Sequence, residues 1–173
     1  MLWLGRRGLS AFLFIAISTS AAQGQSCPEL AELRTRFMDH GTYKQAVETE
    51  QYAVALGKTA DAACQPLITA HRWISHTRSA DFGWDPMSKL TRFNDGVARL
   101  DSLVDAHPEE DIYRALRLSV TGTAPRFLGA DTHWAEDAEA VFRVSNTHFW
   151  AESPKFSEWM VDLAHEVQDK TKP

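Results

Sequence analysis

The chain has 173 residues, of which 44% are hydrophobic, 24% charged and 10% aromatic, with a formal net charge of −5. Six Trp and nine Phe residues in such a composition are typical of a folded domain and exclude an intrinsically disordered chain. The negative charge, together with basic runs of no more than two residues, argues against nucleic acid as a partner.

Residues 1–24 have the features of a secretory signal peptide. Arg6 and Arg7 precede a short apolar core at residues 9–17, and small residues follow that core. A membrane anchor is the alternative, but spanning a membrane takes about 20 apolar residues, which the core does not reach. We therefore expect a mature chain of residues 25–173 that is periplasmic or secreted and has no transmembrane segment. The paired arginines leave the export route open between general secretion and the twin-arginine route.

The mature chain contains two cysteines, Cys27 and Cys64. Cysteine pairs form disulfides in the oxidising compartments that exported proteins enter. If residues 28–39 and 43–57 form an antiparallel helical hairpin, the end of the second helix returns to the start of the first. Cys64 then reaches Cys27, and we expect a disulfide that stabilises the fold by about 3–4 kcal/mol.

The pattern of apolar residues predicts helices along the whole mature chain, because they recur at three- and four-residue spacing and no stretch alternates like a strand. The first two helices are expected at 28–39 and 43–57, and the third from about residue 62, where Pro66 fits the first turn. The mature chain is therefore predicted to be a single all-α domain of six to seven helices in antiparallel hairpins.

The boundaries of the later helices are marked by capping residues and prolines. Asp85-Pro86 begins a helix that ends before His107-Pro108, and a further helix covers 109–120. Residues 122–131 form a loop rich in turn residues, and a helix containing Trp134 follows. Ser153-Pro154 repeats the cap-and-proline start for the last helix.

Part of the chain carries the spacing of a helical-hairpin repeat. The positions that carry it are Leu30, Leu33 and Phe37 in the first helix, Gly41 and Tyr43 at the turn, and Ala46, Ala53 and Leu56 in the second helix. With these positions, residues 27–58 resemble one tetratricopeptide (TPR) unit, a helix–turn–helix of about 34 residues. Arg34, Glu50 and Lys58 depart from the pattern, and residues 93–108 resemble the second helix of another unit. The resemblance implies a scaffold that presents a groove to a protein or peptide; a generic helical bundle is the alternative.

A second pattern runs from His71 to Ala130. It consists of Asp85-Pro86, Lys89-Leu90, Phe93, His107-Pro108, Arg114, Leu116-Arg117, and Pro125 with Phe127-Leu128-Gly129. With this pattern the chain resembles a group of small exported bacterial proteins without an assigned activity. The resemblance implies no catalytic residues.

Three arginines are the leading candidates for a binding site. Arg114 and Arg117 are three positions apart and share a helix face, and Arg126 follows in a loop that contains Gly129. Guanidinium groups that converge in this way can hold a carboxylate or phosphate through two hydrogen bonds. The alternative is structural, with the arginines pairing to acidic residues nearby in the chain, namely Glu109, Glu110, Asp111 and Asp131.

Aromatic residues in loops are the second candidate. Trp84 lies in the 79–85 loop and Phe127 in the 122–131 loop, where each can supply apolar contact to a ligand. Alternatively, such aromatics cap the open ends of the helical stack.

The sequence offers little support for catalysis. His71 and His76 are five positions apart, which does not place them on one helix face, and no zinc-protease motif occurs, so we expect no metal site. Neither a serine-nucleophile motif nor a phosphate-binding glycine loop is present, and no cofactor is expected.

The sequence predicts an exported helical binding module that recognises a protein or peptide with an acidic group. Its surface would be a groove between the 79–85 loop, the Arg114/Arg117 face and the 122–131 loop, with Arg114, Arg117 and Arg126 as anchors and Trp84 and Phe127 as apolar contacts. One alternative is a small exported enzyme with His71, His76 or His148 as general base and an anionic substrate. Another is a structural subunit that packs against a neighbour.

Overall fold

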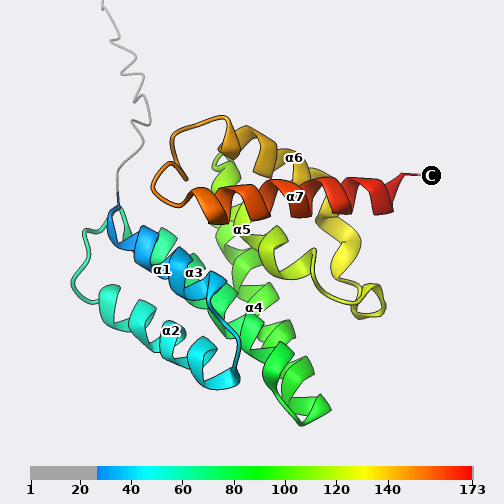
Figure 1. Ribbon diagram of the computed structural model, residues 1–173, viewed down its shortest axis with the longest axis horizontal. Helices are drawn as coiled ribbons and strands as arrows, with labels where there is room; N and C mark the ends of the chain where they lie inside the picture. Colours follow the sequence, from blue (N-terminus) through cyan, green and yellow to red (C-terminus); the bar gives the residue numbers. More distant parts are fainter. Residues whose placement is uncertain (1–26, 173) are drawn as a thin grey trace, which may run out of the picture.

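The computed structural model describes residues 27–172, so the predicted signal peptide lies outside the described residues. The described residues contain no strand and form seven α-helices (Figure 1). These are α1 (Glu29–Met38), α2 (Tyr43–Leu56), α3 (Gln65–Arg78), α4 (Pro86–Ala106), α5 (Asp111–Thr121), α6 (Trp134–Ser145) and α7 (Pro154–Thr171). The predicted all-α class is confirmed. The third helix begins at Gln65 rather than near residue 62, and the other predicted boundaries lie within two residues of those observed.

Capping explains where several helices begin. The Asp85 carboxylate accepts a hydrogen bond from the Ser88 N–H at 2.7 Å, as the Asp85-Pro86 pair predicts. Thr42 caps α2 in the same way by accepting from the N–H of Gln45. At α7 the predicted proline start is present, but the Ser153 hydroxyl forms no capping hydrogen bond.

Two helices, α3 and α5, occupy the centre of the fold. α3 packs against α1, α2, α4 and α5, and α5 packs against α3, α4, α6 and α7. α1 also contacts α7, so the first and last helices meet (Figure 1). The arrangement is a helical bundle in which α2 packs more extensively against α3 than against α1.

A single apolar core runs through this bundle. Its largest fully buried side chains include Trp134, Trp150, Tyr113 and Phe156. On α4, Phe93, Leu100 and Val104 are buried, but Leu90, close to the N-terminal end of the helix, is 39% exposed. The core therefore covers the C-terminal part of α4 better than its first turns.

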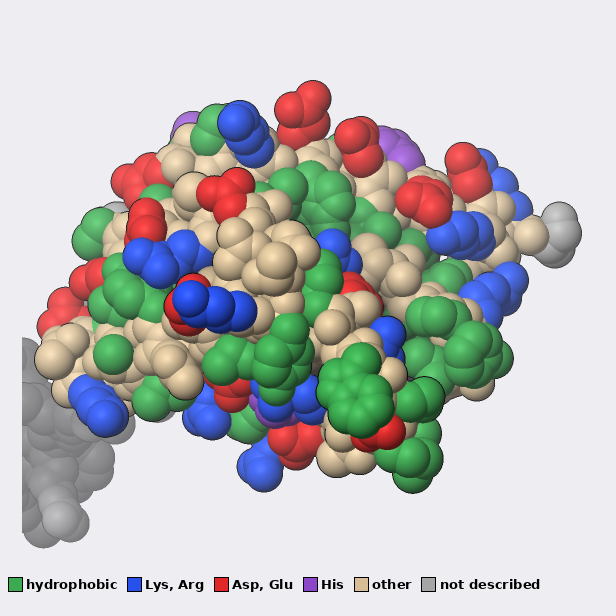
Figure 2. Space-filling model, turned by 60° about the horizontal axis from the view of Figure 1, so that its bottom comes forward, with side chains coloured by type: hydrophobic (Ala, Val, Ile, Leu, Met, Phe, Trp, Pro, Cys, Tyr) green, Lys and Arg blue, Asp and Glu red, His purple; other side chains and the backbone are tan. Residues whose placement is uncertain are grey.

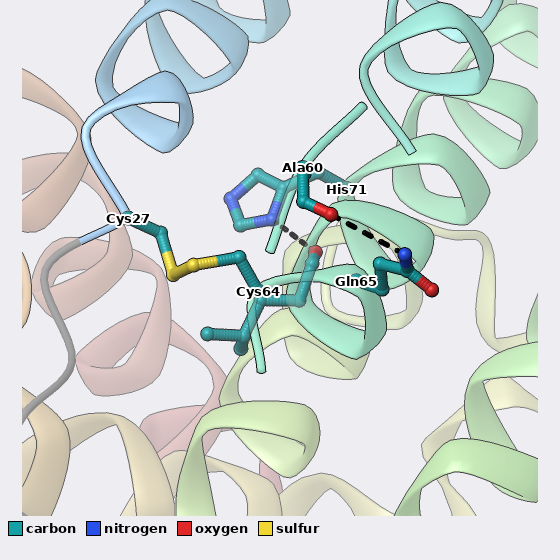
Figure 3. The surroundings of a disulfide bond; sticks show 6 residues. Cys27, Ala60, Cys64, Gln65 and His71 are labelled. Atoms are coloured by element: carbon teal, nitrogen blue, oxygen red, sulfur yellow. Dashed lines mark hydrogen bonds between the residues drawn. A yellow bond between two sulfur atoms is a disulfide. The ribbon is translucent and has the colours of Figure 1, made fainter. Parts of the chain in front are cut away.

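The predicted disulfide between Cys27 and Cys64 is confirmed. It joins Cys27, two residues before α1, to Cys64, the residue before α3, with 5.9 Å between the two Cα atoms (Figure 3). Both cysteines are buried, and the ring of His71 lies nearby. The bridge thus holds the chain's first described turn against the central helix α3.

Within residues 27–172, none of the helices combines the length and the apolar character that crossing a membrane requires.

Candidate functional site

Arg117 is placed in the interior, where it ties three helices together. Only 3% of its surface is exposed. Its Nε and Nη2 atoms donate to the two carboxylate oxygens of Asp137 on α6, at 2.8 and 2.7 Å. Nη1 donates to Asp101 on α4 at 2.8 Å, and Nη2 also donates to Glu136 at 3.0 Å. Three carboxylates thus accept all of these hydrogen bonds from the guanidinium. Arg117 therefore holds helices together and is not available to bind a ligand.

The electrostatics of this cluster suit a permanent internal ion pair. Burial raises the pKa of Asp137 to about 6, although the hydrogen bonds and charge of Arg117 act in the opposite direction, so the carboxyl is ionised at neutral pH. Burial on its own lowers the pKa of Arg117, but the hydrogen bonds and charges of Asp137 and Asp101 raise it above its usual value. The structural partners are Asp101, Glu136 and Asp137, which the sequence analysis did not single out for this role.

Arg114 and Arg126 do not converge with Arg117 on one ligand position. Arg114 turns back along the chain and donates to the carbonyl of Pro108 at 2.7 Å, with Asp111 at 4.0 Å. Arg126 donates from Nε to Asp131 at 3.1 Å, and its side chain remains largely exposed. The guanidinium groups of Arg114 and Arg117 are therefore occupied by acceptors within the protein, and Arg126 is the accessible arginine of the three.

Phe127 and Trp84 are the two most exposed large apolar side chains among residues 27–172. Phe127 is 86% exposed and lies in a short 3-10 turn, Arg126–Leu128, that ends at Gly129 in the left-handed conformation (φ 68°). Trp84 is 95% exposed and lies just before α4, after the 3-10 turn Ser79–Phe82. Neither aromatic caps the helical stack, because neither is packed.

The apolar surface around Trp84 continues into the first turns of α4. Met87 is 69% exposed and Leu90 is partly exposed on the same helix. Beside them lies a shallow, open depression of about 360 Å³ between α4 and the start of α2. Its lining residues are Tyr43, Met87, Ser88, Thr91 and Arg92. Figure 2 shows the face that contains this end of the molecule, where hydrophobic side chains form separate patches among charged ones. The surface is therefore a set of apolar contacts rather than a deep groove.

The three candidate catalytic histidines differ in their surroundings. His71 is buried, with its Nδ1–H donating to the Leu67 carbonyl at 2.8 Å. His76 lies between Glu50, 3.1 Å from Nδ1, and Asp95, 3.6 Å from Nε2. His148 is itself exposed and lies in the 146–153 segment. Within residues 27–172 no group of His, Cys, Asp and Glu side chains is arranged to hold a metal ion.

Glu50 and Arg92 form a polar cluster around His76 that the sequence analysis did not find. Glu50 accepts a hydrogen bond from Arg92 at 3.0 Å, and Arg92 also donates to the Ser79 hydroxyl. Burial would raise the pKa of Glu50, but His76, Arg92 and Arg72 together hold it below its usual value. The cluster joins α2, α3 and α4. Its only signal in the sequence is Glu50, a carboxylate at a position where the repeat pattern has an aromatic residue.

Comparison with known proteins found no matching family model, no matching curated protein and no matching solved structure.

Proposed function

We propose that the mature chain is an exported helical binding module that recognises a protein or peptide carrying an acidic group. The observation that supports this most is the near-complete exposure of Trp84 and Phe127, at 95% and 86%. Fully exposed aromatic side chains gain the most when a partner buries them, and aromatic residues are enriched at binding hot spots. Export is supported by the Cys27–Cys64 disulfide, which is typical of oxidising compartments.

Arg126 is the residue that we propose for the acidic group. It lies next to Phe127 in the chain, and its ion pair with Asp131 is exposed to solvent. Such surface pairs contribute only about 0–1 kcal/mol, so a partner carboxylate can replace Asp131 at little cost. Arg117 is excluded from this role by its burial, and Arg114 is directed toward the carbonyl of Pro108. The proposed surface is therefore Trp84, Met87, Arg126 and Phe127.

A selection of displayed random peptides on the mature protein tests this proposal. We expect the native protein to enrich peptides that combine acidic and apolar residues. The Trp84→Ser/Phe127→Ser variant should enrich none of them, and Arg126→Glu should lose the acidic preference while keeping the apolar one. Val54→Ser, which changes an exposed apolar residue on α2, is the matched control and should behave like the native protein. Enrichment that persists in the double aromatic variant would refute the proposed surface.

A further inference from the structure

Arg34 is a guanidinium buried in an aromatic part of the core. It lies on α1, where only 2% of its surface is exposed, and its Cζ atom is 5.3 Å from the Phe149 ring centroid and 6.0 Å from that of Phe156. Its one hydrogen bond is long, from Nη1 to the Phe149 carbonyl at 3.4 Å. A buried charge normally has a hydrogen-bonded counter-charge, and no carboxylate of residues 27–172 pairs with Arg34.

The two unpartnered nitrogens of Arg34 form a carboxylate-binding fork. Nε and Nη2 are buried and have no acceptor among the described residues. The same two atoms hold a carboxylate at two other arginines of this protein. Arg117 uses them for Asp137, and Arg143 uses them for Asp111 at 2.6 and 2.9 Å. The Nε and Nη2 atoms of Arg34 can therefore bind a carboxylate through two hydrogen bonds, as the same atoms do at Arg117 and Arg143.

Further polar atoms without partners lie in the segment that covers Arg34. Residues 146–153 connect α6 to α7, and this segment supplies the Phe149 carbonyl to Arg34. The Trp150 Nε1 and the Ser153 hydroxyl are also buried without a hydrogen-bond partner. Both groups can donate a hydrogen bond to an anion. Burial lowers the pKa of Arg34 to about 10, with the charge of Glu152 acting against this change, so Arg34 is charged at neutral pH.

The covering segment is held to α1 by little hydrogen bonding. Its own backbone hydrogen bonds are local: Thr147 N–H donates to Val144, Ala151 N–H to His148, and Ser153 N–H to Trp150. The hydrogen bond that connects it to α1 is the long one from Arg34 to Phe149. A shift of the segment at Phe149 therefore breaks few polar contacts and gives a small ligand a route to the guanidinium, while Trp150 stays packed against Phe156 in the core.

We propose that Arg34 forms a second binding site, in which its Nε and Nη2 atoms bind the carboxylate of a small organic acid. The site is independent of the exposed surface around Trp84 and Phe127.

Thermal unfolding of the mature, disulfide-bonded protein in sodium acetate and sodium formate tests this site, with sodium chloride at equal ionic strength as reference. At a carboxylate concentration ten times the Kd, we expect Tm to rise by about 3–6 °C over chloride. Arg34→Met should abolish the rise, and Arg34→Lys should weaken binding because an ammonium group lacks the fork. Arg36→Met is the matched control, since Arg36 is exposed on the same helix and pairs with Glu32. It should keep the full response.

A native Tm that is equal in acetate, formate and chloride, or a rise that survives in Arg34→Met, would overturn the proposal. If Arg34→Met does not fold, the Arg34 Nε–H signal in the ¹⁵N NMR spectrum of the native protein tests the site instead. Its chemical shift should change on titration with formate, and an unchanged chemical shift overturns the proposal. Glu152→Gln distinguishes the source of the carboxylate. A response in that variant but not in the native chain would assign the fork to Glu152 and overturn the proposal.

Discussion

Asp137 and Asp111 each hold one arginine through two hydrogen bonds, and they differ in burial. Asp137 is fully buried against Arg117, whereas Asp111 pairs with Arg143 in solvent. Removing one partner of a buried pair costs up to about 3–5 kcal/mol, although Arg117 keeps Asp101 and Glu136 when Asp137 is replaced. Exposed pairs contribute about 0–1 kcal/mol. We therefore expect Asp137→Asn to lower the free energy of unfolding by several times as much as Asp111→Asn. Urea denaturation at neutral pH measures both, and equal losses would contradict the structural role of Arg117.

The buried histidines predict the response to acid. Burial is the main cause that lowers the pKa of His71 to about 3 and that of His40 to about 4. Both titrate near 6.5 in an unfolded chain, so between these values the unfolded chain binds more protons than the folded one. The two histidines should therefore lower the free energy of unfolding as the pH decreases from about 6.5 to 4, and the raised pKa of Asp137 offsets part of this loss.

Urea denaturation at pH 7 and pH 4.5 checks this expectation. His71→Asn should lose part of the difference in unfolding free energy between the two pH values. The exposed His148→Asn is the control and should keep the native difference. If the difference in His71→Asn equals that of the native protein, His71 is not a source of the acid sensitivity.

At the scale of single elements, Gly96 sets the approach of α4 to α3. A Cβ atom at this position would overlap the Thr77 hydroxyl, which is held in place by its hydrogen bond to the Trp73 carbonyl at 2.8 Å. Overpacking of this kind costs about 1–3 kcal/mol, although alanine is otherwise the better helix former. We expect Gly96→Ala to destabilise the protein, and Thr77→Ala in the same chain to recover part of the loss because it removes the hydroxyl. Thermal denaturation of the double-mutant cycle measures this coupling, and simple additivity would contradict the close contact.

The helices were predictable because their signals are local. The apolar periodicity and the Asp85-Pro86 start act within a few residues of sequence, and the structure confirms them. The partner of Arg117 was not predictable, because Asp137 is 20 positions away and the pair forms only when α5 packs against α6. Ser153 shows the limit of a local motif. Its sequence predicts a cap, but its hydroxyl is buried without forming the bond.

The candidate site was predictable only in part. Trp84 and Phe127 were identified from loop sequence, and the structure shows both exposed. The expectation of converging arginines used only their spacing on one helix. It could not include the carboxylates of α4 and α6, which packing brings to Arg117. The unsatisfied donors of Arg34 likewise depend on what surrounds α1 in three dimensions.

At the scale of the whole molecule, the disulfide connects the first of the described residues, Cys27, to the start of the central helix α3. It joins positions 37 apart, so the unfolded chain loses considerable freedom when the bridge is closed. We expect Cys27→Ser/Cys64→Ser to lower the free energy of unfolding by about 3–4 kcal/mol in the chain-entropy model. Reductant should destabilise the native protein by a similar amount and leave the double variant unchanged. Equal unfolding midpoints for the native protein with and without reductant would contradict this role.

We propose that the exposed side chains of Trp84, Met87, Arg126 and Phe127 contact a partner. Site-specific photo-crosslinking in the native cells tests this, with p-benzoylphenylalanine placed at position 84 or 127 and, as control, at position 54 on α2. We expect one and the same cross-linked product from positions 84 and 127, lost with Arg126→Glu, and no such product from position 54. The absence of any specific product at both positions, or an equal yield from position 54, would contradict it.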